Sequence, residues 1–262
     1  MIRLAAVILG LALAVPPAAA DSVDDFTAAV PGIPGKTWMD LLRQVFPDIV
    51  LGPKNEAIVH GDIALRPIEK DGVFTDECPD ELKLSSLEVS EARIADKRRL
   101  IVGIATDGDI CVAPLALFEG SGEGKLLDAV NVKQDKNYSF SRDFTRALGP
   151  DGQLLVVTSF HINAGEGYDI ETLILATADK LSSIDSIFAK SETDCRRSVS
   201  REATVGIAPD HGPFARITGY VKTATRRLAA DCQTPQGKEM IAIARTDWRW
   251  NAARRAYTRV PR

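Results

Sequence analysis

The chain has 262 residues, of which 45% are hydrophobic and 26% are charged, and its formal net charge is −4 at pH 7. This balance supplies enough apolar side chains for a packed core and excludes an intrinsically disordered chain. The acidic total argues against a nucleic-acid-binding protein.

The charge is unevenly divided along the chain. Residues 196–262 hold 14 Lys and Arg against 5 Asp and Glu, whereas residues 21–195 hold 17 against 31. A basic C-terminal region can bind an anionic partner, such as an envelope polymer, or it can pair with the acidic part of the same chain. In a single compact chain, the internal pairing is favoured.

Residues 1–20 have the organisation of a signal peptide. An arginine precedes an apolar run from Leu4 to Val15, and three alanines before Asp21 form a small-residue cleavage site. The run is shorter than the ~20 residues that span a bilayer. We therefore expect a cleaved signal, a chain that does not span the membrane, and a periplasmic or secreted protein.

Residues 21–36 contain the segment PGIPG and are predicted to be an extended lead-in. Residues 37–46 are predicted to form a short amphipathic helix, because Thr37 and Asp40 approximate a capping box. Apolar side chains recur there at helical spacing, at Trp38, Leu41, Leu42, Val45 and Phe46. We expect this helix to close one end of a β structure.

The rest of residues 37–262 is predicted to be a single all-β domain. Short alternating apolar and polar runs recur along it, and the long helices of a parallel α/β fold are missing from the pattern. We expect about twelve antiparallel strands in an irregular propeller-like or sandwich arrangement. The interruptions are residues 140–148, predicted to be a short helix or turn, and residues 248–251, predicted to be the turn of a last hairpin.

Four cysteines follow the signal, namely Cys78, Cys111, Cys195 and Cys232. An even number in an exported chain indicates two disulfides. Three pairings are possible, and we favour Cys78–Cys111 and Cys195–Cys232 because each closes a moderate loop within one region. The cysteine and histidine spacing is not that of a zinc site, so no metal and no cofactor are predicted.

The dipeptide Asp107-Gly108 lies between two apolar runs and is typical of a tight hairpin turn. Asp107 and Asp109 flank the glycine and offer two carboxylates, whereas calcium takes six to eight oxygen ligands. No ladder of further acids follows. Turn chemistry therefore explains this pair better than a weak calcium site.

Residues 153–176 form the most informative segment, predicted to be two strands joined by a glycine-bearing loop. Leu154 to Val157 is apolar on both faces, which is typical of a central strand. The tip of this hairpin offers an imidazole, an amide and two carboxylates as candidate ligand-binding groups. They belong to His161, Asn163, Glu166 and Asp169. The alternative is a solvated loop with the histidine hydrogen-bonded at the strand end.

The sequence does not assemble a catalytic set. Ser159 and His161 are two positions apart on one strand, a spacing of about 6–7 Å, longer than the ~3 Å nucleophile–base contact. We therefore expect an exported, disulfide-braced, non-enzymatic binding or interaction module of the cell envelope. Its partner would be an unknown envelope component or small ligand, anionic if it binds the basic C-terminal region. The alternative is an envelope hydrolase acting on polysaccharide or peptide through acids such as Asp107 or Glu166.

Overall fold

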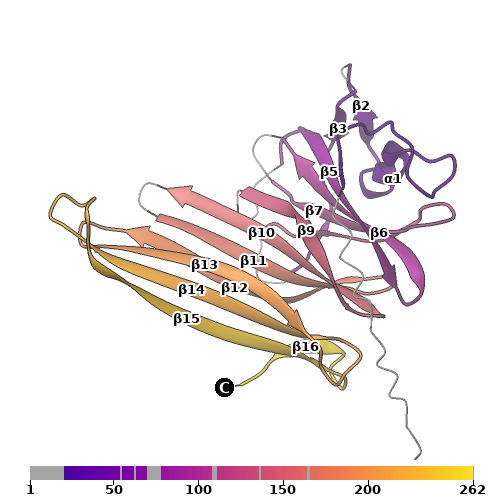
Figure 1. The fold of residues 1–262 in the computed structure, drawn as a ribbon. Coiled ribbons are helices and arrows are strands. Elements are labelled where there is room, and N and C mark those ends of the chain that lie inside the picture. Colours follow the sequence, from indigo (N-terminus) through magenta and orange to yellow (C-terminus); the bar gives the residue numbers. More distant parts are fainter. Residues whose placement is uncertain are drawn as a thin grey trace, which may run out of the picture.

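The computed structural model describes residues 21–261 with gaps at 54, 62, 70–77, 108–110, 136 and 164–165, and only the backbone of residues 142–143. The predicted signal peptide and Gly108 of the predicted Asp107-Gly108 turn therefore lie outside the described residues. The described chain forms sixteen strands and one α-helix, arranged as two eight-stranded sheets (Figure 1). The mainly β, sandwich-like class predicted from the sequence is confirmed, with more strands than the twelve expected.

The first sheet is built from the N-terminal half of the chain. Its strand order is β2-β3-β5-β6-β7-β8-β4, with β1 paired to β5. All its neighbours are antiparallel except β4 and β8, which are parallel. The strands are β1 (Asp21–Val23), β2 (Ile49–Leu51), β3 (Ala57–His60), β4 (Arg66–Pro67), β5 (Glu81–Ile94), β6 (Lys97–Thr106), β7 (Pro114–Glu119) and β8 (Leu126–Asn131).

The second sheet is a meander in which each strand pairs with its neighbour in the sequence, always antiparallel. Figure 1 shows its long strands reaching well past the first sheet. The strands are β9 (Asn137–Gly149), β10 (Gly152–Asn163), β11 (Glu166–Ala176), β12 (Leu181–Thr193), β13 (Arg197–Ala208), β14 (Arg216–Leu228), β15 (Pro235–Asn251) and β16 (Ala256–Arg259).

Strands β12 and β13 hold the second sheet together at one end only. Both strands are described over their whole length, and only two residue pairs join them, namely Glu192 with Val199 and Thr193 with Ser198. Away from this joint the sheet divides into two half-sheets, β9–β12 and β13–β16. Both half-sheets contribute to one hydrophobic core, with members such as Leu148, Leu154, Leu173, Ile187, Ile217, Trp248 and Tyr257.

Strand β10 lies between two cores, as its doubly apolar sequence predicts. Leu155 and Val157 face the first sheet and pack in one core with Ile101 and Leu117. Leu154 faces the opposite way, into the core between the half-sheets. Neighbouring residues of a strand point to opposite faces, so both faces of this strand are removed from water.

Helix α1 (Trp38–Val45) begins where the sequence predicts. The Thr37 hydroxyl accepts the Asp40 N–H, and the Asp40 carboxylate accepts the Thr37 N–H at 2.9 Å, which completes the capping box. The buried face of the helix packs on the first sheet. The predicted lead-in begins with strand β1, and its side chains Phe26, Val30 and Ile33 pack into the same core as the helix.

Two local predictions are wrong. Residues 140–148 are not a helix or turn but part of β9, where Phe140 and Phe144 face the first sheet. A bulge displaces the β9 register opposite Leu155 and Val157, and the extra residues imitate helical spacing. Residues 248–251 are not a turn but the end of β15, because inward Trp248 and Trp250 alternate with outward Arg249 as in a strand.

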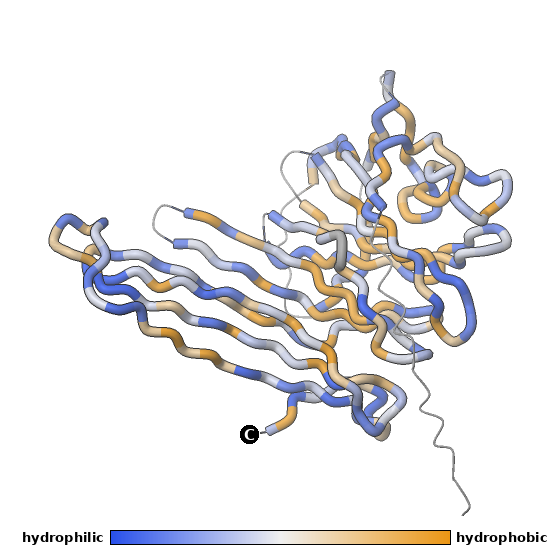
Figure 2. The backbone as a smooth tube through the Cα atoms, viewed as in Figure 1, coloured by the Kyte–Doolittle hydropathy of each residue, from blue (hydrophilic) through white to orange (hydrophobic). Residues whose placement is uncertain are grey.

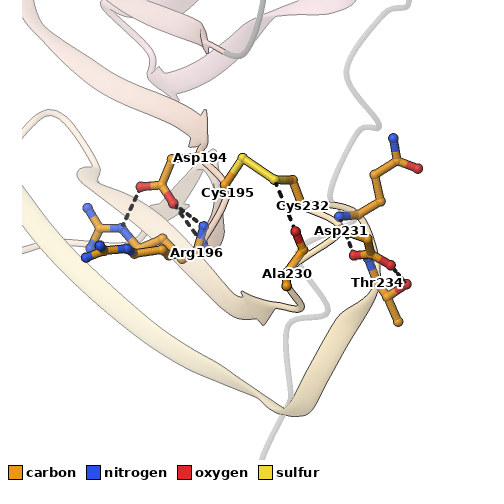
Figure 3. Close-up of a disulfide and its surroundings, with 9 residues drawn as sticks. Asp194, Cys195, Arg196, Ala230, Asp231, Cys232 and Thr234 are labelled. Carbon is orange, nitrogen blue, oxygen red and sulfur yellow. Dashed lines mark hydrogen bonds and ion pairs between the residues drawn. A yellow bond between two sulfur atoms is a disulfide. The ribbon is translucent and has the colours of Figure 1, made fainter.

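Both disulfides have the predicted pairing, Cys78–Cys111 and Cys195–Cys232. Cys195 lies in the β12–β13 turn and Cys232 in the β14–β15 turn, so this bridge fastens two neighbouring hairpin ends (Figure 3). Asp194 and Asp231 organise these turns by accepting backbone N–H groups that follow them. The bridge closes the end at which β12 and β13 meet.

Candidate functional site

The β10–β11 hairpin brings three of the four predicted site residues to one face. His161 lies opposite Tyr168 and Asn163 lies opposite Glu166, and directly opposed residues share a face. Asp169 lies opposite Phe160, one position out of phase, so its side chain projects from the other face. The predicted group is therefore divided between the two faces of the hairpin.

A buried carboxylate, Asp135, organises the histidine face. Its side chain is 2% exposed, and its Oδ1 atom lies 3.5 Å from His161 Nδ1. The Tyr168 hydroxyl donates to the other carboxylate oxygen. This hydrogen bond, with burial and the nearby negative charge, raises the pKa of Tyr168 to about 12. Tyr168 therefore remains a protonated hydrogen-bond donor. The buried Asp135 carboxylate fixes the positions of both the His161 and the Tyr168 rings.

Three rings form a row across β10, β11 and β12. His161 and Tyr168 are stacked at 5.3 Å between centroids with 12° between ring planes, and Tyr168 lies 5.3 Å from Phe188. Phe188 is 55% exposed although it is a large apolar side chain. We call His161, Tyr168 and Phe188 the aromatic row. It presents ring surface on rigid strands, an arrangement suited to stacking against a planar or cyclic ligand.

Charged side chains border the aromatic row. Lys190 Nζ lies 3.2 Å from a Glu166 oxygen and 3.9 Å from a Glu192 oxygen. These groups are partly exposed, so they remain accessible to the polar groups of a ligand. Together with the Asn163 amide they provide both donors and acceptors at the edge of the row.

Ser159 lies on the same face as His161 but is fully enclosed. Its Oγ atom accepts the Gln134 N–H at 3.4 Å, and the side chain has no exposed area. The Nε2 amide of Gln134 is also buried, and no hydrogen-bond partner for it lies within the described residues. The serine is therefore part of the support behind the row and is not presented to solvent as a nucleophile.

The opposite face of the hairpin carries a second acidic pair, Asp169 and Glu171, directed between the half-sheets. Burial raises the pKa of Glu171, and the charge of Asp169 raises it further. The Thr158 hydroxyl, which donates to Glu171 at 3.0 Å, and the Arg146 charge oppose this shift. Glu171 is consequently a carboxyl group that retains its proton to a higher pH than an exposed glutamate does.

A hollow of about 540 Å³ lies at the other end of the half-sheets. Its walls include Phe214, Trp250 and Tyr257, whose rings pack together at 4.5 to 6.3 Å between centroids. Phe214 and Tyr257 are each only 7% exposed. These rings therefore serve mainly to cover the edge of the core.

The two acids considered for a hydrolase belong to different sheets. The Asp107 N–H donates to the Lys83 carbonyl at 2.9 Å at the end of the first sheet, whereas Glu166 lies at the tip of the β10–β11 hairpin. Asp109, the second carboxylate of the pair considered for calcium, lies outside the described residues. Within the part of the chain that is described, no three His, Cys, Asp or Glu side chains gather as a metal site.

The basic C-terminal region forms ion pairs both with acids of its own and with acids of residues 21–195, where Arg197 pairs with Glu192 and Asp194. Several arginines have carboxylate partners within the basic region while their side chains remain about half exposed. These pairs are Arg226–Glu239, Arg245–Asp247 and Arg249–Asp210. Arg259 instead reaches Asp185 in the acidic part of the chain. The guanidinium groups thus remain accessible to solvent.

Three of the organising residues, Tyr168, Phe188 and Asp135, are absent from the predicted set of ligand-binding residues, although Tyr168 lies within the hairpin segment 153–176. Phe188 offered only a local signal, an aromatic residue in an alternating run. Asp135 offered none, because a loop brings it to the histidine from 26 positions away in the chain. The register of two strands and the path of that loop are needed to assemble the row.

No protein-family model matches this chain, and no curated protein and no solved structure matches it at a significant level. The only helix among the described residues, α1, is too short to cross a membrane.

Proposed function

We propose that this protein is an exported binding module of the cell envelope that holds a sugar ring of an envelope polysaccharide on the aromatic row. The observation that carries this proposal is the row itself: Phe188 is half exposed beside two rings that Asp135 fixes in place. Exposed aromatic surface that is already ordered loses little conformational freedom when a ligand binds.

The polar border of the row supports a ligand rich in hydroxyl groups. Binding sites commonly combine ring surface with a few polar groups that fix the ligand's orientation. Lys190, Glu166 and Asn163 supply both hydrogen-bond donors and acceptors beside the rings. The two disulfides support a protein that works in an oxidising compartment, as an envelope ligand requires.

The test measures binding to purified peptidoglycan sacculi by co-sedimentation and to envelope glycans on an array. Phe188→Ala removes the exposed ring and should weaken binding about two- to ten-fold, since one aromatic contact contributes ~0.5–1.5 kcal/mol. Ile162→Ala is the matched control, because Ile162 is 78% exposed on the opposite face of the same hairpin. Equal binding by wild type and both Phe188→Ala and Tyr168→Ala would reject the proposal.

One observation favours the second candidate, an envelope hydrolase. Glu171 has a raised pKa, and Asp169 lies two positions away on the same face. Such spacing places two carboxyl groups about 6–7 Å apart, and a pair of carboxyl groups at a separation of this order can serve in glycoside hydrolysis. This candidate requires that wild type release reducing ends from sacculi and that Glu171→Gln abolish the release. If the wild-type protein does not release reducing ends, the hydrolase candidate is rejected.

A further inference from the structure

The outermost long strand, β15, has one side that no other strand covers. Strand β14 pairs along its inner side, while β16 pairs only with Trp248 to Asn251 on its outer side. No other strand of the described chain pairs with the outer side of residues 238–246, which we call the free edge. Figure 1 shows β15 at the margin of the second sheet. An uncovered strand edge is a template for pairing with another strand.

The central side chains of the free edge are apolar, and its large apolar side chains are exposed. Met240 is 60% exposed, Ile241 58% and Ile243 65%. The β15 tube in Figure 2 accordingly carries a hydrophobic stretch away from the cores. Proteins usually protect an exposed edge with central charges, proline or a bulge. Here the charged residues are at the two ends, and the centre from 240 to 244 has none.

The backbone N–H and C=O groups of alternate residues in the free edge point to its outer side. The Asp247 carbonyl accepts the Val260 N–H at 2.8 Å on the outer side of β15. The register with β14 is unbroken from Trp248 to Met240, so the alternation of an antiparallel ladder continues. The N–H and C=O groups of Ile241, Ile243 and Arg245 therefore point to the same outer side as those of Asp247.

We propose that two copies of this chain pair antiparallel through the free edge, with a two-fold axis at Ala242. A two-fold axis normal to the sheet keeps each residue on the same face in both copies, and directly opposed residues of an antiparallel pair share a face. The axis therefore passes through a residue position and not between two residues. Ala242 is the midpoint of residues 238–246. This register uses the whole edge between Gly237, where φ is +72°, and Trp248, which pairs with Arg259 at the end of β16.

The side chains select the same register as the backbone. With the axis at Ala242, Ile241 lies opposite Ile243 of the second copy, and Glu239 lies opposite Arg245 of the second copy. The symmetry makes each of these contacts twice. An axis at Ile243 would instead oppose Glu239 with Asp247, and an axis at Ile241 would oppose Glu239 with Ile243. Opposite charges and paired branched apolar side chains stabilise antiparallel neighbours, whereas opposed like charges destabilise them.

This interface is separate from the proposed ligand site. The aromatic row lies on β10, β11 and β12, whereas the free edge belongs to β15 at the other margin of the sheet. Disruption of the dimer should therefore leave glycan binding by each subunit intact. The two proposals can fail independently.

The mass of the mature chain is measured by sedimentation velocity over a wide range of micromolar concentrations. Wild type should form a dimer. Arg245→Glu opposes Glu239 with a like charge and should weaken the dimer about ten-fold or more. The double variant Glu239→Arg with Arg245→Glu exchanges the two charges and should restore the dimer in part, because Arg226 and Asp247 of the same chain then lie beside like charges. Arg249→Glu, beyond the free edge, is the matched control and should leave dimerisation unchanged.

A cysteine at the axis tests the register directly. Ala242 would face its own copy in a non-hydrogen-bonded pair with Cα atoms about 4.5 Å apart, within the reach of a disulfide. Ala242→Cys should thus give a covalent dimer on oxidation, whereas Thr223→Cys, directly opposite it on β14, should not. A monomeric wild type, or a dimer that ignores the charge exchange and does not cross-link at residue 242, would overturn the proposal. Pairing only with an unrelated extended peptide would also overturn it.

Discussion

Asp185 on β12 should be among the most important single residues for joining the two half-sheets. Its Oδ2 atom accepts the indole N–H of Trp248 at 2.6 Å, and its Oδ1 atom accepts from Arg259 Nη2 at 2.8 Å. Trp248 belongs to β15 and Arg259 to β16, so one carboxylate links strands from both half-sheets. Asp185→Ala removes these contacts without enlarging any side chain.

The size of the effect follows from the burial of each partner. Trp248 is 1% exposed, so its N–H would be left buried without an acceptor, at a cost of about 1–3 kcal/mol. The Arg259 side chain is 62% exposed, and an ion pair of that kind contributes only about 0–1 kcal/mol. We expect Asp185→Ala to lower the free energy of unfolding by about 1–4 kcal/mol in total.

Urea unfolding followed by circular dichroism, with the disulfides intact, measures this loss. Asp96→Asn is the control, because that carboxylate is 97% exposed and asparagine tolerates its positive φ. In a double-mutant cycle, Trp248→Phe and Asp185→Ala should cost less together than the sum of the single variants. If Asp185→Ala changes stability no more than Asp96→Asn, or if the cycle is additive, the reasoning is refuted.

The pH dependence of this contribution has a defined sign. Burial would raise the pKa of Asp185, but the hydrogen bonds from Arg259, Trp248 and the Ser186 N–H outweigh burial and hold the pKa below its ordinary 3.8. The contribution is therefore complete above pH 3.8 and is lost as the pH falls through the lower folded pKa. The difference between wild type and Asp185→Ala should shrink only in strongly acidic solution.

Two further predictions concern the second sheet. The double variant Cys195→Ser with Cys232→Ser opens a loop of 37 residues and should cost about 4 kcal/mol, which denaturation midpoints can check; a loss below about 1 kcal/mol would contradict the chain-entropy account. Glu171→Gln should become more stable than wild type as the pH rises above 4.5, because burial favours the protonated acid and its contribution is lost once it ionises. Thermal melts at several pH values would show this, and a constant difference would contradict it.

Features set by local chemistry could be predicted from the sequence. The capping box at Thr37 and Asp40 needs residues three positions apart, and it marked the start of α1 correctly. The alternating runs indicated strands, and four cysteines behind a predicted signal peptide indicated two disulfides that close loops of moderate length. Each of these inferences depends on neighbours in the chain and not on the path of distant segments.

Features set by distant segments could not be predicted. The bulge in β9 disguised Phe140 and Phe144 as a helical pattern, because extra residues in one strand are visible only against its partner. The division of the second sheet at β12 and β13 likewise leaves no trace in either strand's sequence. Asp135 reaches His161 only through the folded loop, so the aromatic row was predicted in part and its support was missed.

The connectivity of the second sheet also sets an order of folding. Every strand from β9 to β16 pairs with its sequence neighbour, so this sheet can grow by successive short loop closures. The first sheet must instead bring β1 to β5 and β4 to β8 across long intervening segments. Cys195 and Cys232 flank the β13–β14 hairpin and approach each other once it forms. Oxidation of this pair should therefore precede completion of the N-terminal sheet and provide a chemical marker for the first stage of folding.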